Sequence, residues 1–97
     1  MTDTDTFSNE MIKFDGLDAA ILGIGTLWEG QLRRDLFVYS GETILEILIE
    51  EHGMAEEEAL EYLSFNIESL YAGPGTPIVV WLPTPEEQAE YGLPSYD

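Results

Sequence analysis

The first apolar segment of the chain runs from Ala19 to Gly25 and is rich in β-branched residues and glycine. A short apolar run of this kind is typical of a buried strand. Glycine inside a strand marks a bulge or a close approach of two backbones. The polar stretch EGQLRRD, residues 29–35, predicts a hairpin loop. The apolar run LFVY, residues 36–39, is then the second strand, antiparallel to the first.

A helical pattern begins at Ser40, whose hydroxyl can accept a hydrogen bond from a free N–H of the first turn. The predicted helix covers GETILEILIEEH, residues 41–52. Its apolar residues form one broad arc: Ile44, Leu45, Ile47, Leu48 and Ile49. Such an arc indicates a helix that is buried along one side. Gly53 is a suitable residue to end it.

A second helix is predicted from Ala55 to a point between Ser64 and Leu70, because apolar residues recur there at helical spacing. The segment AGPGTP, residues 72–77, ends this helix with two glycines and two prolines. The apolar run IVVWL, residues 78–82, predicts the third strand.

These elements predict an α+β fold: a small three-stranded sheet in the order β-β-α-α-β, with two helices packed on one face. The 97 residues are enough for one domain. We expect a flexible acidic leader at 1–13, a single α+β domain at 14–82 and a Pro-rich acidic tail at 83–97. One helical turn at Glu86–Tyr91 is compatible with that tail.

The charge of the chain narrows the class of partner. Twenty Asp and Glu residues face three Lys and Arg residues, which gives a net charge of −17. Phosphate backbones and anionic membranes would repel such a protein, whereas cations and basic protein surfaces would attract it. We therefore expect no direct nucleic-acid binding. The longest apolar runs are far below the roughly 18 residues of a membrane span, so no membrane contact is expected either.

The carboxylates are concentrated on the two predicted helices. Glu42, Glu46 and Glu50 are spaced i, i+4, i+8, and Glu57 and Glu61 repeat that spacing beside Glu58. Neighbours of this kind lie about 6 Å apart along one helix face. An array like this can imitate the phosphates of nucleic acid. The alternatives are a solvated surface that serves solubility only and an adaptation to high salt.

No motif of an enzyme or a cofactor site is present. Without cysteine, one histidine makes no zinc site. The sequence GIG at 23–25 lacks the third glycine of a dinucleotide fingerprint. DGLD at 15–18 lacks the alternating ligands of a calcium loop and is better explained by turn chemistry. We expect no catalytic residue, no metal and no cofactor.

Several short segments resemble one family: DGLDAAILGIG, FVYS, GMAEEEALEYLSFNI and YAGPGTPIVV. Together they cover about residues 14–80 and are similar to a family of small acidic proteins from tailed-phage genomes, which has no established activity. The chain departs from the family pattern at Ala55, where a Ser or Thr cap is expected. The resemblance implies phage origin and residence in the host cytoplasm.

The resulting hypothesis is a non-catalytic phage protein that inhibits or redirects a host protein by binding its basic surface. A defence nuclease or another DNA-binding protein would be the target class. The expected partner-binding residues are Glu42, Glu46, Glu50, Glu57, Glu58, Glu61 and, as an apolar anchor, Trp28. The alternative is a structural or accessory phage module, homodimeric through a sheet edge or Trp28. A small enzyme would instead need a deep pocket with two convergent acids.

Overall fold

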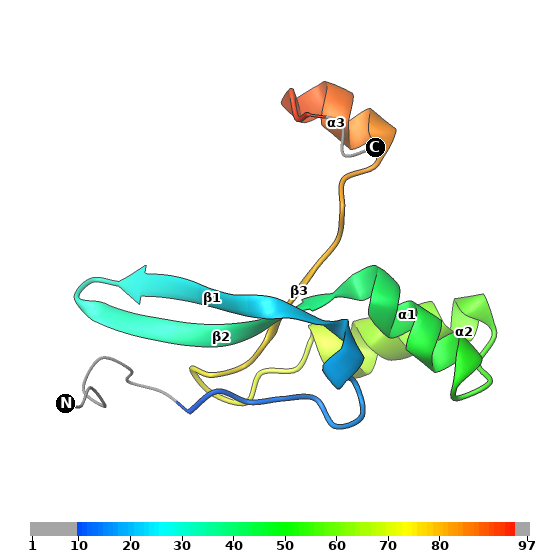
Figure 1. The fold of residues 1–97 in the computed structure, drawn as a ribbon, viewed down its shortest axis with the longest axis horizontal. Helices are drawn as coiled ribbons and strands as arrows, with labels where there is room; N and C mark the ends of the chain where they lie inside the picture. The colour runs from blue at the N-terminus through cyan, green and yellow to red at the C-terminus, as the bar shows by residue number, and fades with distance from the viewer. Residues whose placement is uncertain (1–9, 95–97) are drawn as a thin grey trace.

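The computed structural model describes residues 10–94, and it has the predicted α+β fold (Figure 1). The elements are, in chain order, η2 (Asp18–Ala20), β1 (Ile21–Glu29), β2 (Leu32–Ser40), α1 (Gly41–Glu50), α2 (Glu56–Leu63), η3 (Ser64–Glu68), β3 (Ile78–Val80) and α3 (Pro85–Tyr91). The element η2 is a 3-10 turn, and η3 is a π-helical continuation of α2. The three-stranded sheet has the order β1-β2-β3.

The sheet combines an antiparallel hairpin with one parallel strand. β1 pairs antiparallel with β2, and β2 pairs parallel with β3. A parallel neighbour requires a long crossover, which α1, α2 and η3 supply. The helices lie at one end of the sheet, and the hairpin extends away from them (Figure 1). A bulge between Ile21 and Gly23 confirms the irregularity that the strand glycines predicted.

The predicted hairpin loop at 29–35 is wrong, because the strands continue almost to the tip. Only Gly30 and Gln31 separate β1 from β2, and Gly30 has the positive φ of a tight turn, 62°. The polar residues of this segment stay on the strand because they have cross-strand partners. The Thr26 hydroxyl donates to Asp35 Oδ1 at 2.8 Å, and Arg34 pairs with Glu29 at 2.7 Å.

The prediction that the first strand is buried is also wrong. Leu22 is 65% exposed and Ile24 is 63% exposed. Each strand of the hairpin is nine residues long, and the helices cover only the end where β2 leads into α1 (Figure 1). The helices therefore leave much of β1 exposed, although Asp35 and Leu36 in the middle of β2 are buried.

Both predicted helices are confirmed, together with their ends. The Ser40 hydroxyl accepts a hydrogen bond from the Thr43 amide at 3.2 Å. Gly53 follows α1 with a φ of 71°, and the Met54 amide donates back to the Leu48 carbonyl at 3.2 Å. α2 begins after Ala55 without a side-chain cap.

The core lies between the helices and the inner end of the sheet. Its fully buried members come from η2, β2, α1 and α2: Ala20, Tyr39, Ile44, Ala59 and Leu63. Tyr39 lies at the centre. Its side chain is 0% exposed, and its backbone is paired with Ile21 on one side and Val79 on the other. The Tyr39 hydroxyl accepts a hydrogen bond from the Phe14 amide at 2.9 Å, and the two rings are 4.8 Å apart.

At the ends of the described chain, the N-terminal segment contacts the domain, and the helical turn predicted at Glu86–Tyr91 is present as α3. Residues 1–9 and 95–97 lie outside the described residues. Ile12, which was assigned to the leader, already donates to the Gly75 carbonyl at 3.1 Å. In the tail, α3 has a capping box in which Thr84 and Glu87 bond to each other's amides. α3 has no buried residue and stands away from the body of the protein (Figure 1).

Trp81 closes the crossover directly after β3. Its indole N–H donates to Glu68 Oε2 at 2.8 Å, at the end of η3. Its ring covers Gly41, the first residue of α1. A Cβ atom at Gly41 would lie 2.6 Å from Trp81 Cδ2, far inside van der Waals contact. A residue without a side chain is therefore needed here, although glycine is a poor helix former.

We expect Gly41→Ala to lower the free energy of unfolding by about 1–3 kcal/mol, the usual cost of overpacking. This loss would outweigh the helix propensity that alanine gains, about 1 kcal/mol. Urea denaturation followed by circular dichroism measures it. Gly23→Ala is the matched control, since a Cβ there meets nothing within 4 Å. Equal stability of the two variants would show that Trp81 does not require glycine at 41.

Candidate protein-interaction surface

All three Lys and Arg residues of the chain are engaged in ion pairs away from α1 and α2. Lys13 pairs with Asp18 at 3.1 Å, Arg33 with Asp35 at 3.2 Å, and Arg34 with Glu29 at 2.7 Å. The first pair ties the N-terminal segment to η2, and the other two lie in the hairpin. No Lys or Arg therefore remains to neutralise the carboxylates of the two helices.

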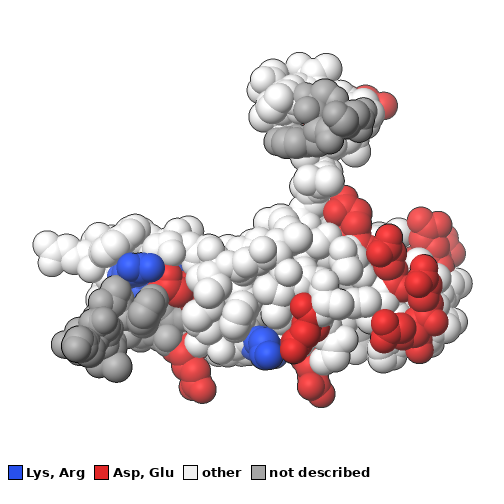
Figure 2. Space-filling model, viewed as in Figure 1, with Lys and Arg blue, Asp and Glu red and all other residues white. Residues whose placement is uncertain are grey.

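Eight exposed glutamates form what we call the acidic face: Glu42, Glu46, Glu50, Glu51, Glu56, Glu57, Glu58 and Glu61. They occupy α1, the turn after it and α2. Figure 2 shows acidic side chains gathered at the helical end of the molecule, away from the hairpin. The six glutamates that were predicted to bind a partner all belong to this face, and all six are exposed.

The buried side of each helix fixes the orientation of the acidic face. Ile44, Ile47 and Leu48 of α1 are buried, so Glu42, Glu46 and Glu50 must lie on the outer side at the alternate helical positions. Ala59 and Leu63 of α2 are buried in the same way and leave Glu57 and Glu61 outside. Packing of the apolar sides therefore holds the carboxylates in place.

Local helix energetics favour only part of the acidic face. Glu56, Glu57 and Glu58 lie in the first turn of α2, where the helix dipole stabilises negative charge. Glu50 and Glu51 lie at the C-terminal end of α1, where the dipole opposes it. Like charges at i, i+4 add a cost of about 0.2–0.5 kcal/mol per pair. Helix stability alone does not account for this arrangement.

Trp28 does not belong to the same surface. It lies on β1 opposite Arg33, near the tip of the hairpin, and is 63% exposed. The hairpin tip and the acidic face are at opposite ends of the molecule (Figure 1). The predicted set of partner-binding residues is therefore divided into two separate surfaces.

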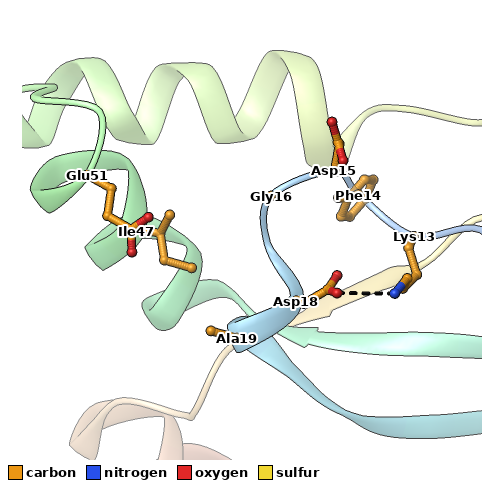
Figure 3. A pocket seen from close by; sticks show the side chains of 8 residues that line it. All are labelled: Lys13, Phe14, Asp15, Gly16, Asp18, Ala19, Ile47 and Glu51. Carbon is orange, nitrogen blue, oxygen red and sulfur yellow. Dashed lines mark hydrogen bonds and ion pairs between the residues drawn. The ribbon is translucent and has the colours of Figure 1, made fainter.

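A cavity of about 410 Å³ lies between the N-terminal segment and α1 (Figure 3). Asp15, Asp18 and Glu51 contribute carboxylates to its lining. Asp18 is paired with Lys13, as the dashed line shows (Figure 3). No group of three or more potential metal ligands occurs within residues 10–94.

An adjacent groove of about 350 Å³ was not predicted from the sequence. Its apolar lining includes Ile12, Met54, Tyr62 and Leu70, with His52 among the polar groups. These residues come from three distant segments of the chain. No local pattern brings such segments together, so sequence analysis had no signal for this groove.

No protein-family model, curated protein or solved structure matches the chain. None of the helices within residues 10–94 has both the length and the apolar character needed to span a membrane.

Tyr39, whose hydroxyl accepts a hydrogen bond from the Phe14 amide, has a perturbed acidity. Burial raises the pKa of its phenol above the ordinary value of 10.0, and Asp18 acts in the same direction. The hydrogen bond from the Phe14 amide and the charge of Lys13 lower this pKa, but burial has the larger effect. The native state therefore keeps the proton at a pH at which the unfolded chain has lost it. The stability that the protonated Tyr39 phenol contributes is therefore complete below about pH 10 and is lost as the pH rises through the native pKa.

We expect Tyr39→Phe to lower the free energy of unfolding by about 1–3 kcal/mol at pH 7, because the buried Phe14 amide loses its acceptor. Above about pH 10 the variant should lose stability less steeply than the wild type, since the raised pKa is gone. Urea denaturation at several pH values between 7 and 11 measures both effects. Parallel pH profiles would contradict the role given to the Tyr39 phenol.

Proposed function

We propose that this protein binds, through its acidic face, the basic surface of another protein that normally holds nucleic acid. The partner is proposed to be a host defence nuclease or DNA-binding protein, and the chain a phage product that inhibits or redirects it. The proposed role is non-catalytic.

The observation that carries the proposal is that all three Lys and Arg residues form ion pairs with acids outside the acidic face. A soluble helix commonly neutralises its glutamates with Lys at i+4. Here Lys13, Arg33 and Arg34 are paired with acids outside α1 and α2. The acidic face therefore keeps its charge for an external cationic partner.

The charge density of the acidic face supports nucleic-acid mimicry. α1 has ten residues, which corresponds to a length of about 15 Å. Three of the eight carboxylates lie on α1 itself, about one per 5 Å of its axis, and the other five lie on the following turn and on α2. Duplex DNA carries about one charge per 1.7 Å of its axis. A basic cleft that fits a phosphate backbone would meet a strongly negative field here as well.

Binding of this kind has a characteristic energetic profile. Complementary charges raise the association rate and the specificity more than the affinity itself. Carboxylates exposed to solvent are screened by salt over about 8 Å at physiological ionic strength. The proposed complex should therefore weaken strongly as salt increases.

We expect the triple variant Glu42→Gln, Glu46→Gln, Glu50→Gln to lose partner binding, because it removes the stripe along α1. Its free energy of unfolding should equal or exceed that of the wild type, since two like-charge pairs disappear. Tagged protein would be used to capture partners from host lysate at low salt and at about 0.5 M salt, where screening is strong. Captured proteins would be identified by mass spectrometry and challenged with duplex DNA.

The matched control is Glu10→Gln, Glu86→Gln, Glu90→Gln, which removes the same charge from exposed positions outside the acidic face. It should retain the partner. Capture of nucleic-acid-binding proteins that salt and DNA release, and that only the first triple variant loses, is the expected result. Equal capture by both triple variants would remove α1 from the proposal. No capture by the wild type would leave the acidic face as a solvated surface.

A further inference from the structure

The hairpin exposes several large apolar side chains. Leu22, Ile24 and Trp28 of β1 are each 63–65% exposed, and Leu32 on β2 is 60% exposed. Ile24 and Trp28 lie on the same sheet face, because they are four residues apart in β1 with no bulge between them. Leu32 pairs with Glu29 and lies on the opposite face. Exposed apolar side chains gathered on one element are a common feature of interaction sites.

The same hairpin forms an open edge of the sheet. Within residues 10–94, β1 pairs with β2 only, so its other side presents backbone N–H and C=O groups. β1 has nine residues, no Pro and no Lys, and its one charged residue, Glu29, is its last. Natural edge strands are usually shortened, charged or covered against unwanted pairing. Apart from the bulge at its start, β1 has none of these protections.

The hairpin is electrically neutral on a strongly acidic molecule. Residues 21–40 contain two acids, Glu29 and Asp35, and two cations, Arg33 and Arg34. The rest of the chain therefore carries the whole charge of −17. Both ion pairs close within the hairpin, as Arg33 bonds Asp35 and Arg34 bonds Glu29. This is the part of the surface that two copies can bring together without mutual repulsion.

We propose that the hairpin is a homodimer interface, in which β1 pairs antiparallel with β1 of a second copy of this chain. The neutral hairpin matches another neutral hairpin and has no excess charge with which to attract a basic partner. The acidic face lies at the end of the molecule away from the hairpin (Figure 2), so antiparallel pairing would keep the acidic faces of the two copies apart. Pairing would satisfy the free backbone groups of both edges and would give the apolar side chains of each β1 apolar cross-strand neighbours.

Pairing of β1 with β1 gives a closed dimer, whereas pairing of β1 with the opposite sheet edge would give an open-ended assembly. Antiparallel pairing of β1 with itself is two-fold symmetric and ends at a dimer. Pairing of β1 with the other edge would be head-to-tail and would continue into fibres. That other edge, β3, has only three residues, and Trp81 directly after it is occupied by Gly41 and Glu68. The geometry therefore favours the closed dimer.

Sedimentation velocity and light scattering after size exclusion test the proposal with the full chain. The wild type should have twice the 10.9 kDa mass of one chain. Ile24→Lys should raise the dimer dissociation constant at least about tenfold, because it places an unpaired charge in the apolar interface. Emission of Trp28 should shift to shorter wavelength on dimerisation. Higher salt should tighten the dimer by screening the two charges of −17.

Phe65→Lys is the matched control, since Phe65 is 73% exposed on η3, outside the hairpin. It should remain dimeric. Circular dichroism of both variants checks that they fold. A wild type that stays monomeric up to about millimolar concentration, an affinity of roughly 4 kcal/mol, would overturn the proposal. A dimer that Ile24→Lys and Leu22→Lys together leave intact, or an open-ended polymer, would overturn it as well. The opposite effects of salt separate its failure from that of the basic-partner proposal.

Discussion

The architecture depends on one buried side chain, Tyr39. Its backbone joins the antiparallel and the parallel halves of the sheet, because it pairs with Ile21 on β1 and Val79 on β3. Its hydroxyl holds the amide of Phe14 at 2.9 Å and so fastens the N-terminal segment beneath the helices. An apolar side chain at this position could fill the space but would leave that amide without an acceptor. The Tyr39 side chain therefore contributes both packing and a hydrogen bond at the point where the sheet, the helices and the N-terminal segment meet.

This central anchor allows the two ends of the protein to differ in chemistry. The helices are held by their apolar sides, so their outer sides can carry glutamates at a cost of only tenths of a kcal/mol per pair. The hairpin is anchored to the core at its inner end, where Ile21 pairs with Tyr39. Ile24 and Trp28 further along β1 can therefore remain exposed. The three cations reinforce this division. Arg33 and Arg34 neutralise the two acids of the hairpin, and Lys13 pairs with Asp18. None reduces the charge of the helices.

Local signals predicted most of the fold, and long-range contacts account for the rest. Ser40 and Gly53 fixed the ends of α1 because caps and stops depend on a few neighbouring residues. The segment 29–35 was mistaken for a loop because its polar residues have partners, such as Thr26 for Asp35, that lie across the hairpin. The need for glycine at 41 was invisible because Trp81, forty residues later, imposes it. The exposure of the glutamates follows from the local helical pattern and was predictable. The separation of Trp28 from them depends on the overall arrangement of the hairpin and helices, and it was not.

The two proposed surfaces are compatible, and together they suggest how the protein would act. Antiparallel pairing of the hairpins would direct the acidic faces of the two copies to opposite ends of the dimer. Two linked sites raise the effective concentration of the second binding event when a partner offers matching basic sites. Nucleic-acid-binding proteins are often symmetric dimers themselves. Salt would act on the two contacts in opposite directions, since screening weakens attraction to a basic partner and relieves repulsion between the copies. Ionic strength would then set the balance between a free dimer and a dimer bound at both ends.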